Sequence, residues 1–82
     1  MNALILIRLP EVLRLRGRRK TAHYSDIAAG LFTHPVSLGA RAVGWPEHEA
    51  QAVNAARIAG KSETEIRALV ASLEAQRGSL AA

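Results

Sequence analysis

Only three residues, Gly17-Arg18-Arg19, separate two segments that both have the pattern of an α-helix. The first segment, residues 9–16, includes Pro10, whose missing N–H is not needed in the first turn of a helix. It stops at Gly17, which can adopt the left-handed conformation that ends many helices. The second segment, residues 20–29, follows at once. So short a glycine-containing link between two helices predicts a helix-turn-helix.

The chain after the second helix predicts a β-hairpin. Val36-Ser37-Leu38 and Ala42-Val43-Gly44-Trp45 alternate loosely between apolar and small residues. They flank the tip Gly39-Ala40-Arg41, where glycine can supply a positive φ. We expect Trp45 to pack on the helices, because a large aromatic ring contributes most when it is buried. A hairpin after a helix-turn-helix is typical of a winged domain.

Two further helices are predicted. Pro46 opens one that runs to Ala59, and Ser62 with Glu65 forms a capping box for another over residues 63–77. The last helix has an apolar stripe at helical spacing, formed by Ile66, Leu69, Val70 and Leu73.

The fold class that follows is mainly α with a small β-hairpin, a winged helix-turn-helix. We expect residues 1–60 to form the DNA-binding domain and residues 61–82 a C-terminal helix that packs on it or mediates dimerisation. The apolar stripe serves either the core or a homodimer, because two-fold DNA readers often need such an interface.

The positive charge lies in the first part of the chain. Residues 1–45 carry seven Lys and Arg against two acidic residues, a net charge of +5, whereas residues 46–82 carry four against five, a net charge of −1. This asymmetry is expected of a protein that binds a polyanion such as double-stranded DNA, although a solvated basic surface is the plainer alternative.

Other chemistries have little support in the sequence. The chain has no cysteine, and His23, His34 and His48 lie at separations that match no common metal-ligand spacing. Glu47 and Glu49 are two residues apart and therefore face different sides of a helix. No glycine-rich phosphate loop is present. We expect no enzyme activity, no metal and no cofactor.

The apolar run Ala3-Leu4-Ile5-Leu6-Ile7 is too short to span a membrane and has the composition of a short buried strand. We expect a cytoplasmic, nucleoid-associated protein without membrane contact.

The second helix of a helix-turn-helix enters the major groove with its N-terminus first, so its opening residues face base edges and phosphates. Arg41 at the wing tip suits a phosphate or a narrow minor groove. Tyr24 can reach a phosphate with its hydroxyl or pack in the core, and His23 can touch DNA from the edge of the packed stripe. The predicted DNA-binding residues are Arg18, Arg19, Lys20, Thr21, His23, Tyr24, Ser25 and Arg41.

Several stretches together resemble the AlpA family of prophage regulators. They are Leu6-Ile7-Arg8-Leu9-Pro10-Glu11-Val12, Gly30-Leu31-Phe32, Pro35-Val36-Ser37-Leu38-Gly39, Arg41-Ala42-Val43-Gly44-Trp45 and Arg57-Ile58-Ala59-Gly60-Lys61-Ser62. The resemblance implies a MerR- or excisionase-like winged helix-turn-helix that controls genes of a prophage or integrative element. It implies DNA contacts by Arg19, Lys20, Thr21 and Tyr24. The chain departs from the family pattern where Arg18 and His23 replace aliphatic anchors and Arg19 replaces a capping serine.

Three functions are compatible with these features. The first is a sequence-specific DNA-binding transcriptional regulator of mobile-element genes. The second is an excisionase-like architectural factor that bends attachment-site DNA. The third is a protein-interaction adaptor with a degenerate helix-turn-helix, which would bind its partner through the stripe Ile66/Leu69/Val70/Leu73.

Overall fold

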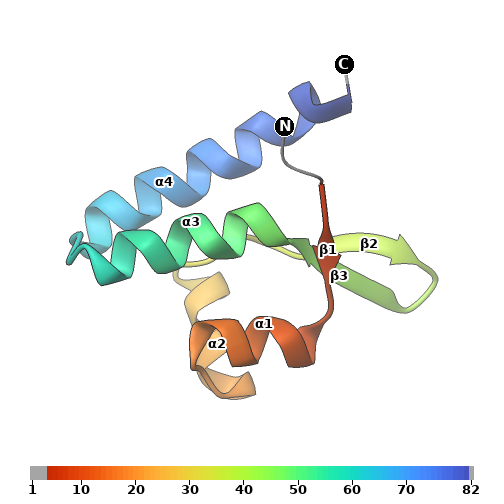
Figure 1. Cartoon of the computed structure of the whole chain (residues 1–82), viewed down its shortest axis with the longest axis horizontal. Helices are drawn as coiled ribbons and strands as arrows, with labels where there is room; N and C mark the ends of the chain where they lie inside the picture. The colour runs from red at the N-terminus through yellow and green to blue at the C-terminus, as the bar shows by residue number, and fades with distance from the viewer. Residues whose placement is uncertain (1–3, 82) are drawn as a thin grey trace.

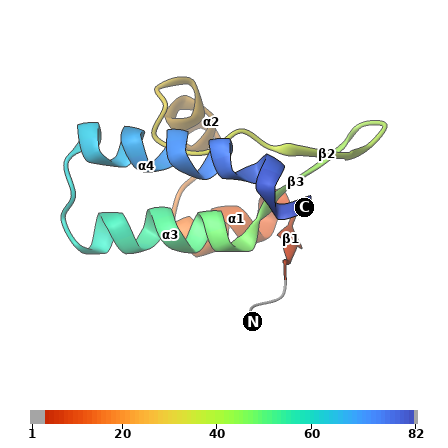
Figure 2. The same ribbon diagram turned by 90° about the horizontal axis from the view of Figure 1, so that it is seen from above.

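A small antiparallel sheet of three strands and four α-helices make up the computed structural model, which describes residues 4–81 (Figure 1). The elements in chain order are β1 (Leu6–Ile7), α1 (Leu9–Arg16), α2 (Lys20–Ala28), β2 (Val36–Gly39), β3 (Ala42–Pro46), α3 (Glu47–Ile58), α4 (Glu63–Gln76) and the 3₁₀ helix η1 (Arg77–Ala81). The strand order is β1-β3-β2, and the β2–β3 hairpin projects away from the helices (Figures 1 and 2). The predicted fold class, mainly α with a small β-hairpin, is confirmed, and the arrangement is compatible with a winged helix-turn-helix.

The turn between α1 and α2 is built by glycine. Gly17 has φ 63° and ψ 34°, the left-handed conformation, and its N–H donates to the carbonyl of Arg14. The N–H of Arg18 donates to the carbonyl of Leu13 at 3.2 Å. These two hydrogen bonds satisfy carbonyls at the end of α1 and reverse the chain into α2. Both helices begin where the sequence predicts, and α2 ends one residue earlier.

The core lies around α3, which packs on α1, α4 and β3, and residues of α2 and of the segment after it complete it. Trp45 is fully buried, as predicted, and its indole Nε1 donates to the carbonyl of Thr33 at 3.0 Å. Asn54 on α3 donates to the carbonyl of Leu15 at 2.8 Å and so ties α3 to the end of α1. The buried apolar residues are Ile7, Val12, Ile27, Leu31, Phe32, Trp45, Ala50, Val53, Ile66, Val70 and Leu73.

Helix α4 packs on α3 with its apolar stripe, and Figure 2 shows the two helices side by side. Ile66, Val70 and Leu73 are buried, and Leu69 packs against them. Of the two alternatives for this stripe, the structure shows packing in the protein's own core. A homodimer of this chain stays a prediction. The adaptor hypothesis loses its proposed binding surface, because the stripe is occupied by this core.

The hairpin turns at Gly39, with φ 141°, and at Arg41, with φ 64°. Glycine was predicted to supply the positive φ, but Arg41 adopts one as well, which is uncommon for a residue with a side chain. At Gly44 a Cβ atom would lie 2.9 Å from Leu38 Cδ1 and 3.0 Å from the carbonyl oxygen of Ile7. The absence of a side chain at Gly44 therefore lets β1 and the Leu38 side chain of β2 approach β3 closely.

The first apolar run differs from the prediction of a buried strand. Strand β1 holds only Leu6 and Ile7, and of these only Ile7 is buried, while Leu4, Ile5 and Leu6 are exposed. Ala3 lies outside the described residues. Pro46 precedes α3 as its N-cap instead of opening the helix. No helix among residues 4–81 has the length and hydropathy needed to cross a bilayer.

Candidate nucleic-acid interface

The amino end of α2 presents basic and polar side chains to solvent. Arg19 is the N-cap residue, with an extended backbone and no side-chain hydrogen bond to the helix. Arg19, Lys20 and Thr21 are all exposed. Because no side chain caps α2, its first backbone N–H groups and its positive dipole end stay open to an anion.

Tyr24 and Ser25 continue this surface by one helical turn. Lys20 and Tyr24 are four residues apart, as are Thr21 and Ser25, so each pair lies on one side of α2. The Tyr24 side chain is 40% exposed and its ring meets that of His23 edge-on, with centroids 5.1 Å apart. Tyr24 therefore packs with one side of its ring and remains accessible.

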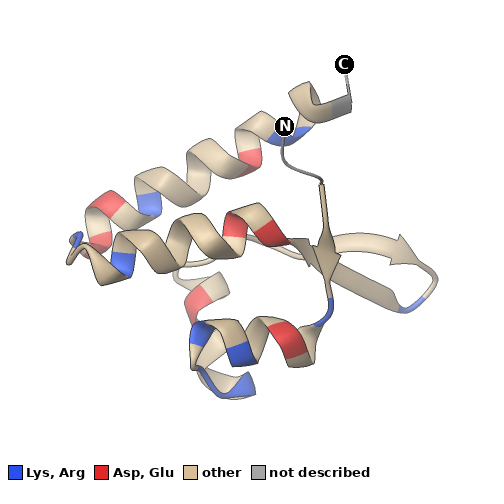
Figure 3. Ribbon diagram, in the orientation of Figure 1, with Lys and Arg blue, Asp and Glu red and all other residues tan. Residues whose placement is uncertain are grey.

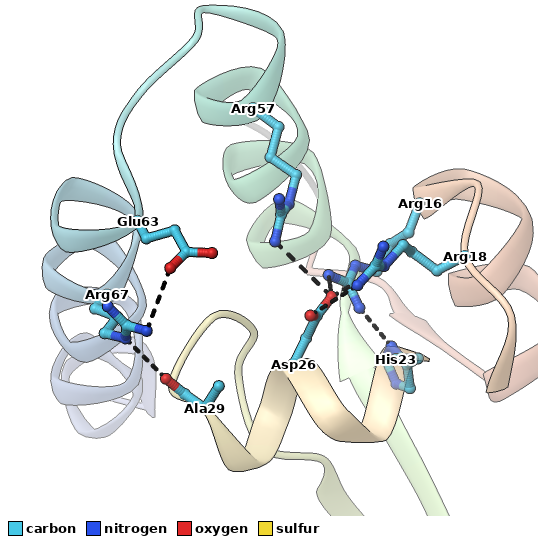
Figure 4. Close-up of polar contacts among 8 residues, drawn as sticks. All are labelled: Arg16, Arg18, His23, Asp26, Ala29, Arg57, Glu63 and Arg67. Atoms are coloured by element: carbon cyan, nitrogen blue, oxygen red, sulfur yellow. Dashed lines mark hydrogen bonds and ion pairs between the residues drawn. The ribbon is translucent and has the colours of Figure 1, made fainter. Parts of the chain in front are cut away.

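His23 is a correction to the sequence prediction. Its side chain is fully buried against Phe32 and Trp45, with ring centroids 5.3 and 5.0 Å away. Arg16 lies 2.7 Å from His23 Nδ1 (Figure 4). A guanidinium can only donate, so Nδ1 accepts and the imidazole is neutral. Burial, with the nearby Arg16 charge, lowers the pKa of His23 to about 4. His23 is a core residue and presents nothing to DNA.

Arg18 differs from its neighbour Arg19. Its Nε and Nη2 donate to the two carboxylate oxygens of Asp26 at 3.0 and 2.8 Å. Asp26 also accepts from Arg16 at 2.7 Å and has Arg57 at 3.8 Å (Figure 4). We call these residues the Asp26 cluster: Arg16, Arg18, His23, Asp26 and Arg57. Arg18 is 39% exposed but already holds a carboxylate.

The Asp26 cluster has a buried interior. The side chain of Arg16 is 1% exposed and its guanidinium lies 4.0 Å from the centre of the Phe32 ring. Burial lowers the pKa of Arg16, against the raising effect of Asp26. Burial also opposes ionisation of Asp26, but the hydrogen bonds from Arg18 and Arg16 outweigh it and leave the pKa of Asp26 below its usual value. Both groups are charged at neutral pH.

Arg41 stands at the exposed tip of the hairpin. Figure 3 shows basic positions on α1, at the start of α2 and at this tip, and further ones along α3 and α4 that lie close to acidic positions. Among residues 4–81, five Lys and Arg side chains have no carboxylate within 4.0 Å. We call them the free cations: Arg8, Arg14, Arg19, Lys20 and Arg41. All lie in the first part of the chain.

The cations of the C-terminal part are paired. Arg77 donates to both oxygens of Glu49 at 2.8 and 2.6 Å, and the Glu49 side chain is fully buried. Arg67 donates to the carbonyl of Ala29 at 2.9 Å and has Glu63 at 3.6 Å (Figure 4). The uneven charge seen in the sequence is therefore sharper in space, because the C-terminal cations are engaged with acids or carbonyls.

A groove of about 280 Å³ beside β1 is mostly apolar, with Leu4, Ile5, Leu6 and Leu80 in its lining. Within the described part of the chain, no three His, Asp or Glu side chains gather in a way that could hold a metal ion.

Comparison with known proteins shows which family the sequence matches. Residues 5–57 match the sequence model described as "Prophage CP4-57 regulatory protein (AlpA)". The chain is also 42% identical over 55 residues to the uncharacterized protein ORF88 of Enterobacteria phage P4. That match covers 67% of this chain and 62% of the phage protein, so the chain spans less than two thirds of this relative's length. No solved structure matches the chain.

Proposed function

Because the chain belongs to the AlpA family of prophage regulatory proteins, we propose that it binds double-stranded DNA in a sequence-specific way and regulates transcription of prophage or mobile-element genes. The observation that carries the proposal is the placement of the free cations. Arg19 and Lys20 stand at the uncapped start of α2, and Arg41 stands at the tip of the wing.

In this proposal α2 enters the major groove with its amino end first. Arg19, at the N-cap position, suits a phosphate beside the groove, while Lys20 and Thr21 suit bases or phosphates. Tyr24 and Ser25, one turn later, offer hydroxyl groups to the DNA backbone. Arg41 at the wing tip binds a flanking phosphate or a narrow minor groove.

The test begins with selection of bound sequences from random DNA by the wild-type protein, followed by titration of the selected duplex at several salt concentrations. The double variant Lys20→Gln/Arg41→Gln removes two proposed phosphate contacts. The slope of log affinity against log salt should fall in magnitude by about 1.8, because each neutralised phosphate contributes about 0.9.

A matched control changes cations that lie outside the proposed interface. Lys61→Gln/Arg67→Gln removes the same charge from the C-terminal part and should leave the slope unchanged. Wild-type protein without salt-sensitive binding to any duplex would disprove the proposal. Phased sites that are bent without any change in transcription would instead assign the excisionase-like architectural role.

A further inference from the structure

We propose that Arg18 and Asp26 form a positioning pair, in which Asp26 holds Arg18 against the α1–α2 turn so that Arg19 and Lys20 are aimed at DNA while Arg18 itself binds no phosphate. This inference rests on the DNA-binding function proposed above. It assigns different roles to two adjacent arginines that are both among the DNA-binding residues predicted from the sequence.

The first support is the position of Arg18 in the turn. Its backbone N–H is held by the carbonyl of Leu13 at 3.2 Å, and its guanidinium is held by Asp26 in the last part of α2. The pair thus joins the residue before the N-cap to the body of the helix. Since α2 has no side-chain cap, this bridge, beside the contacts of Arg16 with His23 and Asp26, fixes how the chain enters the helix.

The second support is the strength of the hold on Arg18. The contact is bidentate, the geometry in which arginine and carboxylate bind most specifically. The Asp26 side chain is only 8% exposed, and Arg16 beneath it keeps the carboxylate oriented at 2.7 Å (Figure 4). A phosphate that recruited Arg18 would have to replace two short charge-assisted hydrogen bonds. We infer that Arg18 stays with Asp26 when DNA binds.

The third support is the contrast with the next residue. Arg19 is exposed and has no carboxylate within 4.0 Å among the described residues. The two arginines are covalent neighbours with the same charge, so each is a matched control for the other.

The experiment compares Arg18→Met with Arg19→Met. Both variants remove one charge and keep an unbranched apolar stem. Affinity for the selected duplex and for an unrelated duplex is measured over a range of salt concentrations. Arg19→Met should reduce the salt slope by about 0.9 on both duplexes. Arg18→Met should leave both slopes unchanged but weaken binding to the selected duplex about tenfold, the order of one misread base pair.

Folding is controlled within the same set. Arg18→Met keeps the buried Arg16–Asp26 pair, whereas a substitution of Asp26 would leave Arg16 buried without a partner and is avoided. Arg18→Lys restores the charge without the bidentate geometry, so it should keep the slope and recover only part of the lost discrimination. Amide hydrogen exchange of free protein should speed up at residues 18–22 in Arg18→Met and not in Arg19→Met.

Two results would overturn the positioning pair while wild-type binding persists. One is a slope reduced by about 0.9 in Arg18→Met, which would make Arg18 a phosphate contact. The other is unchanged discrimination together with unchanged hydrogen exchange. If the wild-type protein shows no salt-dependent DNA binding, the proposed function is overturned. The role of the Arg18–Asp26 pair in DNA recognition is then overturned as well.

Discussion

Arginines from the end of α1 through the following turn occupy two contrasting environments within a few residues. Arg16 and Arg18 belong to the Asp26 cluster, where a nearly buried carboxylate holds both. Arg14 and Arg19 are free cations, exposed and without a carboxylate within 4.0 Å among the described residues. A basic run in a sequence is therefore not a uniform binding surface. The carboxylate of Asp26 pairs with Arg16 and Arg18 inside the fold, whereas Arg14 and Arg19 remain free to bind a partner.

Breaking the Asp26 cluster has the largest expected effect on stability. Arg16→Met should lower the free energy of unfolding by about 3–5 kcal/mol, because it removes two short charge-assisted hydrogen bonds, one to Asp26 and one to the buried His23. Arg14→Met removes an exposed cation and should change it by less than about 0.5 kcal/mol. Urea denaturation followed by circular dichroism measures both. Similar losses in the two variants would show that the cluster contributes no more than the surface.

Lowering the pH should reduce the free energy of unfolding, because His23 in the Asp26 cluster resists protonation in the folded protein. The pKa of His23 is about 4 in the folded protein, against an ordinary value of about 6.5, so the unfolded chain binds the proton first. Stability is therefore lost as the pH falls from about 6.5 to about 4, by roughly 3 kcal/mol in total. Thermal or urea denaturation at several pH values measures this loss.

The control for this pH dependence is His23→Asn, whose side-chain oxygen can still accept from Arg16 but cannot be protonated in this range. The variant should show a flatter stability profile between pH 6.5 and 4. An equally steep profile in the variant would place the acid sensitivity elsewhere.

At the wing tip, the effect of the Arg41 charge on DNA binding can be separated from the effect of its backbone conformation on stability. Arg41 has φ 64°, a conformation that costs a residue with a side chain about 1–2 kcal/mol. Arg41→Gly should raise the free energy of unfolding by about 0.5–1 kcal/mol, the remainder being lost to the greater freedom of unfolded glycine, while it weakens DNA binding. Arg41→Ala should weaken binding equally without the gain in stability. Equal stability of the glycine and alanine variants would contradict a backbone cost at this site.

An exposed ion pair should have as small an effect on stability as an exposed free cation. Lys61 is 4.0 Å from Glu65 on the surface of the C-terminal part, with both side chains more than half exposed. Lys61→Ala should change the free energy of unfolding by no more than about 0.5 kcal/mol, and less at high salt. Urea denaturation at two salt concentrations measures this. A loss of several kcal/mol would remove the distinction between surface pairs and the Asp26 cluster.

Local signals in the sequence were sufficient for most of the helices and the wing. The left-handed Gly17 ends α1, and the predicted capping box of α4 is present, with Ser62 Oγ accepting from Glu65 N–H at 3.2 Å. Such features depend on residues a few positions apart. Their chemistry is therefore readable before the fold is known.

The Asp26 cluster could not be read in this way, because its contacts join residues seven or more positions apart. His23 was expected at the edge of the helix stripe and lies inside the core. Arg18 was expected to be as free as Arg19. Two signals were available. The family resemblance places Arg18 and His23 at positions of aliphatic anchors, and Asp26 is the only acidic residue between Glu11 and Glu47, in a segment with six Lys and Arg. A lone acid in such a segment is a candidate for internal pairing.

The buried pair of Glu49 and Arg77 has a consequence for how this chain can be joined to part of a relative. Glu49 lies within the family match of residues 5–57, whereas Arg77 lies beyond it. A hybrid chain that joins residues 1–57 to the C-terminal part of a relative keeps this ion pair only if that relative supplies a cation in place of Arg77. The edge of the family match therefore falls inside a contact that holds α3 and the C-terminal part together.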